Sequence, residues 1–393
     1  MRITEVRTVA VEYRYAERPP MSGGGVNAAR AALLVIVETD SGLTGIGESG
    51  VAGGPSISTK TVVDRELAPL VVGQDPFEVE RLWRLMAVRT RQHGRRGLLM
   101  HAIAGIDMAL WDLIGKALKQ PLYRILGAYR DRVPAYASGG FFFEGKSTQD
   151  LAEECRRYRE EGYGGVKIKI GRNRGDYALS PMEVSAGNDL CVTTPEEDLE
   201  RIRASREAIG PNMKLMADVN CAWSAATATT MAKRMEPYNL FWLEEPITPE
   251  DVVGSAALAA STTVPIAGYE TASGMGEYRA LIDARAVDVV QVDLSWSGGI
   301  TEARRIAAYA YAHHLPFAPH VFTSAVNVAA SLHLAASIPN GTLFELDQNV
   351  NRLRTDLIAN PFKIDGNGDI RVPDAPGLGI ELNDDVVREL TIS

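Results

Sequence analysis

The chain has 393 residues, of which 46% are hydrophobic and 23% charged, and its formal net charge is -9. These values exclude a disordered chain, and no run approaches the roughly 20 apolar residues of a membrane helix, so we expect no membrane association. Three scattered cysteines predict a reducing cytoplasm, and the negative charge argues against nucleic acid as a partner.

The first third of the chain combines strand and helix patterns. The strand patterns cover residues 3–15, 31–39 and 43–48. Asp40-Ser41-Gly42 predicts a hairpin turn between the last two, and glycine-rich loops lie at residues 19–25 and 49–58. Apolar residues at three- and four-residue steps predict a helix over residues 98–118. We therefore expect residues 1–132 to form a small α+β domain.

After residue 132, short apolar strands alternate with amphipathic helices. The expected strands are residues 133–137, 165–170, 214–218, 241–244, 266–268, 289–291, 317–318 and 342–345. Eight βα units most naturally close into a (β/α)8 barrel over residues 133–355, with a doubly wound open sheet as the alternative. Residues 370–382 read as a further strand with a turn at Pro376-Gly377-Leu378-Gly379, so we expect the segment 356–393 to return to the first domain.

A residue that can carry charge or a proton recurs at or just after the ends of six consecutive strands. In chain order these residues are Asp218, Glu244, Glu270, Asp293, His320 and Glu345. A parallel barrel brings the C-terminal ends of its strands to one rim, where enzymes with this architecture build their active sites. Single acids at strand ends are often helix caps or solvated loop residues, but six in register favour a functional site.

The first three of these residues predict a metal site. Asp218, Glu244 and Glu270 come from consecutive strands, and three converging carboxylates repel one another unless a cation lies between them. Oxygen ligands suit a hard cation, so we expect one Mg²⁺ per subunit with open positions for a substrate oxygen. Such a cation, with nearby lysines, would let an acidic protein bind an anionic substrate.

Lys167 and Lys169 lie two residues apart on the second strand, so their ammonium groups share one face. We expect this face to be the barrel interior, because a solvated pair would need an edge strand and a barrel has none. Two adjacent lysines raise the cost of charging both, which predicts a lowered pKa and a usable base near neutral pH.

His320 is expected to face these lysines across the cavity. Asp293 on the neighbouring strand can orient His320 and raise its basicity. Among the other histidines, His93 lies in a glycine-flanked basic loop that could contact an anion, with a plain surface position as the alternative.

Several motifs occur in the order typical of one family. They are residues 102–116 (AIAGIDMALWDLIGK), Lys167-x-Lys169, Asp218-Val219-Asn220, Glu244-Glu245-Pro246 and Gly298-Gly299-Ile300. With the other strand-end residues, they resemble the mandelate racemase and muconate lactonizing enzyme group of the enolase superfamily. The resemblance implies a TIM-like (β/α)8 barrel and an α+β capping domain built from the N-terminal region and the C-terminal segment. It also implies a homo-oligomer, from dimer to octamer.

The resemblance further assigns roles to the site residues. Asp218, Glu244 and Glu270 bind Mg²⁺, Lys169 is the acid or base on one face of the substrate with Lys167 beside it, and the Asp293–His320 dyad acts on the other face. Glu345, rather than the more distant Asp347, hydrogen-bonds the substrate carboxylate. The expected substrate contacts are Asn220 and the loops at residues 21–27, beginning with Met21, and 49–58.

The chemistry that this resemblance implies begins with removal of the proton next to a carboxylate. The resulting enediolate is stabilised by Mg²⁺ and Lys167, and by Glu345 if it is protonated. Loss of the β-hydroxyl then gives a 2-keto-3-deoxy acid, so we expect a dehydratase of aldonates or aldarates. Racemisation or epimerisation and cycloisomerisation are the alternatives, and a non-catalytic binding protein on the same fold is a further one.

One interval departs from the regular spacing. Lys169 and Asp218 are separated by nearly twice the usual distance along the chain, so residues 172–193 must form an additional loop on the active-site rim. Arg172, Arg174 and Tyr177 are its candidates for contact with substrate or a neighbouring subunit. A plain surface excursion is the alternative.

Overall fold

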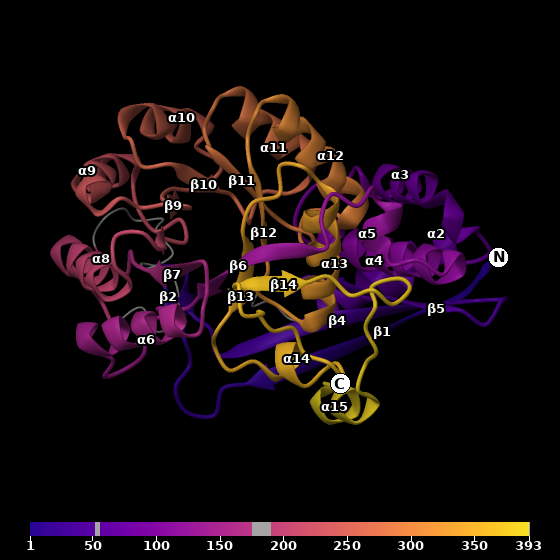
Figure 1. The fold of residues 1–393 in the computed structure, drawn as a ribbon. Helices are drawn as coiled ribbons and strands as arrows, with labels where there is room; N and C mark the ends of the chain where they lie inside the picture. Colours follow the sequence, from indigo (N-terminus) through magenta and orange to yellow (C-terminus); the bar gives the residue numbers. More distant parts are fainter. Residues whose placement is uncertain (52–55, 175–189, 393) are drawn as a thin grey trace.

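The computed structural model describes residues 1–51, 56–174 and 190–392. A sheet of eight parallel strands forms its centre (Figure 1). These strands are β6 (Arg132–Ser138), β7 (Gly165–Lys169), β8 (Lys214–Asp218), β9 (Trp242–Glu244), β10 (Ile266–Gly268), β11 (Val289–Asp293), β12 (Phe317–His320) and β13 (Phe344–Asp347). The sheet runs in chain order from β6 to β12, with β13 beside β6. A bridge between Phe317 and Gly341 nearly closes the ring, which confirms the barrel over the open sheet.

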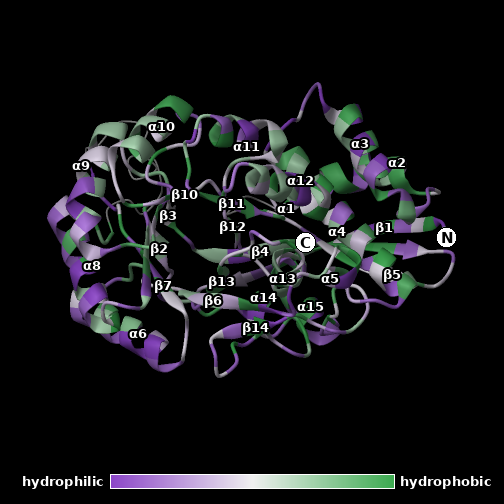
Figure 2. Cartoon of the chain, turned by 45° about the horizontal axis from the view of Figure 1, so that its top comes forward, coloured by the Kyte–Doolittle hydropathy of each residue, from purple (hydrophilic) through white to green (hydrophobic). Residues whose placement is uncertain are grey.

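Helices follow the barrel strands. They are α6 (Thr148–Glu160), α8 (Pro195–Ile209), α9 (Ala225–Met235), α10 (Val252–Ser261), α11 (Gly274–Asp283), α12 (Gly299–Ala312), α13 (Ala325–Ser337) and the short α14 (Arg352–Thr355). All of them except the almost fully buried α13 have an exposed or partly exposed face. Ser147 and Thr194 begin α6 and α8 with reciprocal capping boxes. Figure 2 shows hydrophilic colouring on α6 and α8 at the periphery, as expected for helices with one face on the sheet and one in solvent.

The strand register brings the strand-end residues to one level of the barrel. Asp218 on β8 pairs with Lys169 on β7 and with Glu244 on β9. On the other side of the ring, Asp293 on β11 pairs with His320 on β12. Because neighbouring strands lie about 4.8 Å apart, these pairings alone place successive side chains within contact distance.

The N-terminal region forms a three-stranded antiparallel sheet covered by helices. The strands are β1 (Ile3–Arg14), β4 (Ala29–Thr39) and β5 (Thr44–Ser49), with a small hairpin of β2 (Met21–Ser22) and β3 (Gly25–Val26). The helical segments are α1 (Ser56–Val62), η1 (Val63–Leu67), α2 (Ala68–Val71), η2 (Pro76–Glu78), α3 (Val79–Thr90), α4 (Leu98–Leu118) and α5 (Leu122–Ile125).

Helix α4 is the central element of this region and packs closely against β5. A Cβ atom at Gly47 would lie 2.0 Å from the carbonyl oxygen of Gly105, so only glycine permits this approach. By length and composition α4 could cross a membrane, but 89% of its most apolar window is buried in the protein. This burial is typical of a core helix.

The C-terminal segment differs from the sequence prediction. Within residues 356–392, the described part of this segment, only β14 (Asp369–Arg371) is a strand, and it pairs antiparallel with β6 of the barrel. The expected strand is wrong beyond Arg371, where Pro373 lacks an N–H donor, whereas the expected turn at residues 376–379 is confirmed by the positive φ angles of Gly377 (73°) and Gly379 (66°).

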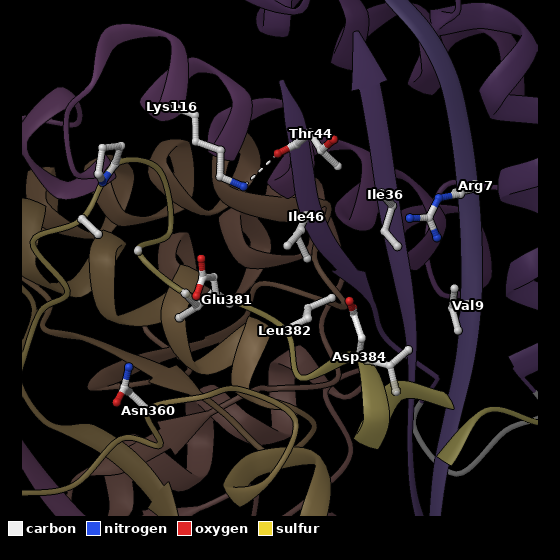
Figure 3. Close-up of a pocket in the computed structure, with 15 residues that line it drawn as sticks. Arg7, Val9, Ile36, Thr44, Ile46, Lys116, Asn360, Glu381, Leu382 and Asp384 are labelled. Atoms are coloured by element: carbon white, nitrogen blue, oxygen red, sulfur yellow. Dashed lines mark hydrogen bonds between the residues drawn. The ribbon is translucent and has the colours of Figure 1, made fainter. Parts of the chain in front are cut away.

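Beyond this turn, the chain does reach the N-terminal sheet. Helix α15 (Asp384–Leu390) lies beside β1, where Thr391 bridges to Val11 (Figure 1). A cavity of about 670 Å³ beside this segment is lined by Ile36 and Ile46 of the sheet and by Leu382 of the segment, which are labelled in Figure 3. We keep the division into residues 1–132, 133–355 and 356–393 as a proposal.

Candidate active site

Three buried carboxylates converge at the C-terminal end of the barrel. Asp218 and Glu244 end β8 and β9, and Glu270 follows β10 by two residues. One ligand oxygen from each lies within 4.8 Å of the other two, and none of the three is more than 7% exposed. All donors are carboxylate oxygens, the ligand type that hard divalent cations prefer.

The two lysines lie against this triad. The Nζ atom of Lys169 forms an ion pair with Asp218, and that of Lys167 forms one with Glu244. Lys167 Nζ also lies 2.7 Å from Glu345 Oε1 and 3.8 Å from Asp218 Oδ2. Both ammonium groups therefore occupy the barrel interior, as the alternation along β7 predicts.

The expected fall of a lysine pKa is not seen in this arrangement. Burial alone would lower the pKa of both lysines, but the carboxylates beside them more than offset it. The pKa of Lys167 is raised well above its ordinary value by Glu244 and Glu345, and that of Lys169 is raised by Asp218. The predicted fall is wrong because carboxylates on other strands attract the two ammonium groups more strongly than these groups repel each other.

The carboxylates of the triad are not equally stabilised as anions. Burial raises the pKa of Glu244 to about 7 and that of Glu270 to about 8, with Lys167 and His320 respectively opposing the rise. The pKa of Asp218 is lowered, because Lys169 and Lys167 outweigh its burial. Burial thus makes the ionised forms of Glu244 and Glu270 less favourable, and a divalent cation would stabilise these ionised forms. The residues fit Mg²⁺.

His320 contacts the opposite end of the triad from Lys169. Its Nε2 atom lies 3.1 Å from Glu270 Oε2, and its Nδ1 atom lies 2.8 Å from Asp293 Oδ2. Burial would lower the pKa of His320, but Glu270, Glu345 and Asp293 together raise it to about 10. The direction agrees with the expectation that Asp293 increases the basicity of His320.

Glu345 contacts Lys167 and accepts hydrogen bonds from two further groups. Its oxygens accept hydrogen bonds from Ser138 Oγ (2.6 Å) and the backbone N–H of Val321 (3.0 Å). Burial would raise the pKa of Glu345, but Lys167 and His320 lower it to about 2. In this arrangement Glu345 is ionised and can only accept hydrogen bonds, so the expected donation from its protonated form is not supported.

A cavity of about 400 Å³ opens beside Lys169, Glu270 and His320. Its remaining wall comes partly from the barrel and partly from the N-terminal region. These wall residues, none of them singled out from the sequence as individual site residues, are Ser22, Gly24, Val26, Asn27, Ala29, Arg30, Ala31, Phe141, Cys221, Glu245, Thr271, Trp296, Phe322 and Thr323. An arginine directly before the apolar run at residues 31–37 was the available signal for Arg30.

Of the four residues expected to contact the substrate, only Asn220 lines the cavity, and Met21, His93 and Arg172 do not. Asn220 lines the cavity, and its Oδ1 atom is buried without a hydrogen-bond partner among the described residues. Met21 is buried in the β2–β3 hairpin, next to the lining residue Ser22. His93 is a correction, because it lies on the surface with Nε2 2.8 Å from Glu66 and does not line the cavity.

Arg172 is a second correction. Its guanidinium is buried and donates hydrogen bonds to the backbone carbonyls of Ser22 and Gly25, and to that of Leu190 at 2.6 Å. Arg172 thus fastens the hairpin over the cavity and does not line the cavity itself. Tyr177, residues 52–55 of the second loop and residues 175–189 of the long loop lie outside the described residues.

Two family models match the chain. Residues 150–386 match the model described as "Enolase C-terminal domain-like". Residues 3–127 match the model described as "Mandelate racemase / muconate lactonizing enzyme, N-terminal domain". Together the two matches include nearly all the elements described above.

Known proteins resemble the chain over almost its whole length. The chain is 36% identical over 353 residues to the arabinonate dehydratase of Saccharolobus solfataricus, covering 90% of this chain and 88% of the relative. It is 36% identical over 400 residues to the D-galactarolactone cycloisomerase of Agrobacterium fabrum, covering 99% and 98%. A crystal structure of a racemase from Streptomyces coelicolor with bound magnesium superimposes with a TM-score of 0.87 at 28% identity, covering 99% and 100%.

Proposed function

The chain belongs to the mandelate racemase and muconate lactonizing enzyme group of the enolase superfamily, and from this premise we propose that it is a Mg²⁺-dependent acid-sugar dehydratase. The substrate, an aldonate or aldarate, loses the proton at C2 and the hydroxyl at C3. The products are water and a 2-keto-3-deoxy acid.

One observation carries this proposal. Lys169 and His320 line one cavity and contact opposite ends of a buried carboxylate triad, through Asp218 and Glu270 respectively. Elimination of water needs a base at the α-carbon and an acid at the departing hydroxyl. A substrate carboxylate held at the triad would place both atoms between these two side chains.

Each residue has a defined task in this scheme. Mg²⁺ held by Asp218, Glu244 and Glu270 would supply positive charge beside the substrate carboxylate and so make the C2 proton more acidic. The ammonium group of Lys167 donates a hydrogen bond to the same carboxylate as negative charge develops on it. Glu345 keeps Lys167 protonated and in place through their 2.7 Å contact.

The proton is then moved by Lys169 and His320. One of them removes it from C2, and the other protonates the C3 hydroxyl as it leaves. The configuration at C2 decides which side chain is the base. Asp293 holds the Nδ1 side of His320, so that Nε2 is the atom directed toward the reacting carbon.

A second candidate is a cycloisomerase, favoured by the similarity to the galactarolactone enzyme over 99% of this chain. In a lactone the leaving atom is the ring oxygen β to the free carboxylate. Its expulsion opens the ring without releasing water, so the product has the mass of the substrate. The same triad, lysine and histidine serve both reactions.

The setting of the enzyme also belongs to the proposal. The partner is a small carboxylate, and we propose a homo-oligomer and a cytoplasmic location. No disulfide joins Cys155, Cys191 and Cys221, which supports a reducing compartment.

The experiment is incubation with a library of aldonates, aldarates and their lactones, with and without Mg²⁺. A 2-keto-acid reagent and mass spectrometry read the products. A keto acid lighter than its substrate by one water supports the dehydratase, and an isomeric keto acid from a lactone supports the cycloisomerase. Exchange of the C2 proton without any keto acid would favour a racemase or epimerase and reject both.

A further inference from the structure

A buried arginine from the N-terminal region forms part of the cavity wall. Arg30 lies at the start of β4, its side chain is 2% exposed, and it lines the same cavity as Lys169 and His320. Its guanidinium carbon lies 3.5 Å from the centroid of the Phe322 ring. That ring in turn lies 5.9 Å from the ring of His320. The Phe322 ring therefore neighbours both the guanidinium of Arg30 and the imidazole of His320, one of the two side chains proposed to transfer protons.

Much of the hydrogen-bonding capacity of Arg30 is unused. Its Nη2 atom lies 3.3 Å from Oδ2 of Asp347, whereas Nε and Nη1 have no hydrogen-bond partner among the described residues. Asp347 is shared, because its Oδ1 atom accepts hydrogen bonds from Asn349. A buried N–H group without a partner costs free energy, and more so when the group is charged. A ligand oxygen at Nη1 or Nε would remove this cost.

The proposed reaction assigns no role to the positive charge of Arg30. Among the described side chains that line the cavity, only Lys169, His320 and Arg30 can be positively charged. Lys169 and His320 contact the triad. Arg30 contacts Asp347 instead, which lies outside the triad and does not line the cavity.

From this geometry we propose that Arg30 binds the second carboxylate of a dicarboxylic sugar acid, so that the preferred substrate is an open-chain aldarate. This inference rests on the proposed function, which places the first carboxylate at the triad. The carbon chain of a six-carbon acid, with bonds of about 1.5 Å, would then run along the cavity wall from His320 past Phe322 toward Arg30, all of which line the same cavity. An aldonate would place a neutral hydroxymethyl group beside Arg30 and forgo the charge-assisted hydrogen bond.

The test compares a six-carbon aldarate with the aldonate of the same configuration, in saturating Mg²⁺. We expect the aldarate to have a kcat/KM at least about 10-fold higher in the wild-type enzyme. Arg30→Gln should raise the KM for the aldarate roughly 10- to 100-fold and change the KM for the aldonate by less than about 3-fold. Arg7→Gln is the matched control, because it removes an arginine from the neighbouring strand β1 that does not line this cavity.

An independent variant covers the case in which Arg30→Gln does not fold. Asp347→Asn removes the acid that neutralises Arg30, and it should lower the KM for the aldarate relative to the aldonate. An unchanged ratio would overturn the assignment, as would wild-type enzyme that prefers aldonates or Arg30→Gln enzyme that affects both substrates equally.

Failure of the proposed function is a separate result. It would appear as wild-type enzyme that makes no keto acid from any substrate. Calorimetric binding of the aldarate with Mg²⁺ would then still decide the role of Arg30. Equal binding by wild type and Arg30→Gln would reject it.

Discussion

The Nδ1 atom of His320 lies 2.8 Å from Oδ2 of Asp293, at the ends of two adjacent parallel strands. The other oxygen of Asp293 is occupied, since it accepts hydrogen bonds from Ser295 Oγ (2.6 Å) and Asn327 Nδ2 (3.2 Å). Asp293 is therefore fixed, and it in turn fixes the orientation of the imidazole ring. The pair leaves Nε2 as the atom available for proton transfer.

Replacement of this histidine tests its role directly. His320→Asn should lower kcat by roughly 10²- to 10⁴-fold, because asparagine cannot accept or deliver the proton. Binding of Mg²⁺ should persist, since His320 is not one of the triad. The control is His313→Asn, which changes a histidine at the end of α12. Substantial turnover in His320→Asn would remove this residue from the mechanism.

Removal of one triad charge should weaken metal binding. Glu244→Gln keeps the size of the side chain but removes a charged ligand, so we expect the affinity for Mg²⁺ to fall roughly 10- to 100-fold. Isothermal titration calorimetry measures this change. Mg²⁺ at about 100 times its Kd should also stabilise the wild type by about 2.7 kcal/mol, seen as a higher Tm.

The matched control for the metal site is Glu48→Gln. Glu48 is a fully buried carboxylate on β5 that accepts a hydrogen bond from Asn327 N, outside the triad. The Glu48→Gln variant should bind Mg²⁺ with nearly the same affinity as the wild type. An equal loss in both variants would show that general burial of charge, and not ligation, sets the metal affinity.

The hydrogen bonds from Arg172 to the β2–β3 hairpin should affect substrate binding more than the rate of the chemical step. Arg172→Lys keeps the charge but loses the planar set of donors that holds Ser22 and Gly25. We expect KM to rise roughly 10-fold and kcat to change less, because Lys169 and His320 are not touched. Arg159→Lys, which alters an arginine bonded to the carbonyl of Ala208 in α8, is the comparison. A fall in kcat at constant KM would contradict this role of Arg172 in substrate binding.

Asp107 should make stability depend on pH. It is fully buried in α4, its Oδ2 atom accepts the N–H of Thr301 near the start of α12, and burial raises its pKa to about 7. Between its ordinary pKa of about 3.9 and about 7, the folded protein holds a proton that the unfolded chain has released. The contribution of Asp107 to the free energy of unfolding therefore falls as pH rises through this window.

Asp107→Asn cannot ionise and should escape this fall. Urea unfolding at several pH values should show the stability of the variant, relative to wild type, increasing from about pH 4 to about pH 7. Glu17→Gln, an exposed carboxylate of the same region, serves as the control. A relative stability that is flat or falls with pH would contradict the assignment.

The rim of the barrel could be predicted because it depends on local patterns. An acid or histidine that ends a strand must lie at one edge when the strands are parallel, so Asp218, Glu244 and His320 followed from spacing alone. The expected fall in a lysine pKa failed because it depends on acids contributed by other strands. The sequence marks Arg30 as a charge beside an apolar strand, but its place in the cavity wall next to Phe322 could not be predicted, because it arises from docking of the N-terminal sheet on the barrel.

Proton transfer at C2 in D₂O with Mg²⁺, followed by ¹H NMR, tests the central claim most directly. With an acid sugar that is turned over, we expect wild-type enzyme to remove the C2 proton and to yield a 2-keto acid carrying one deuterium at C3. Lys169→Ala and His320→Asn should each form no keto acid while retaining Mg²⁺ binding. Keto-acid formation at the wild-type rate in either variant, or a keto acid that carries no deuterium at C3, would contradict an elimination carried out between these two side chains.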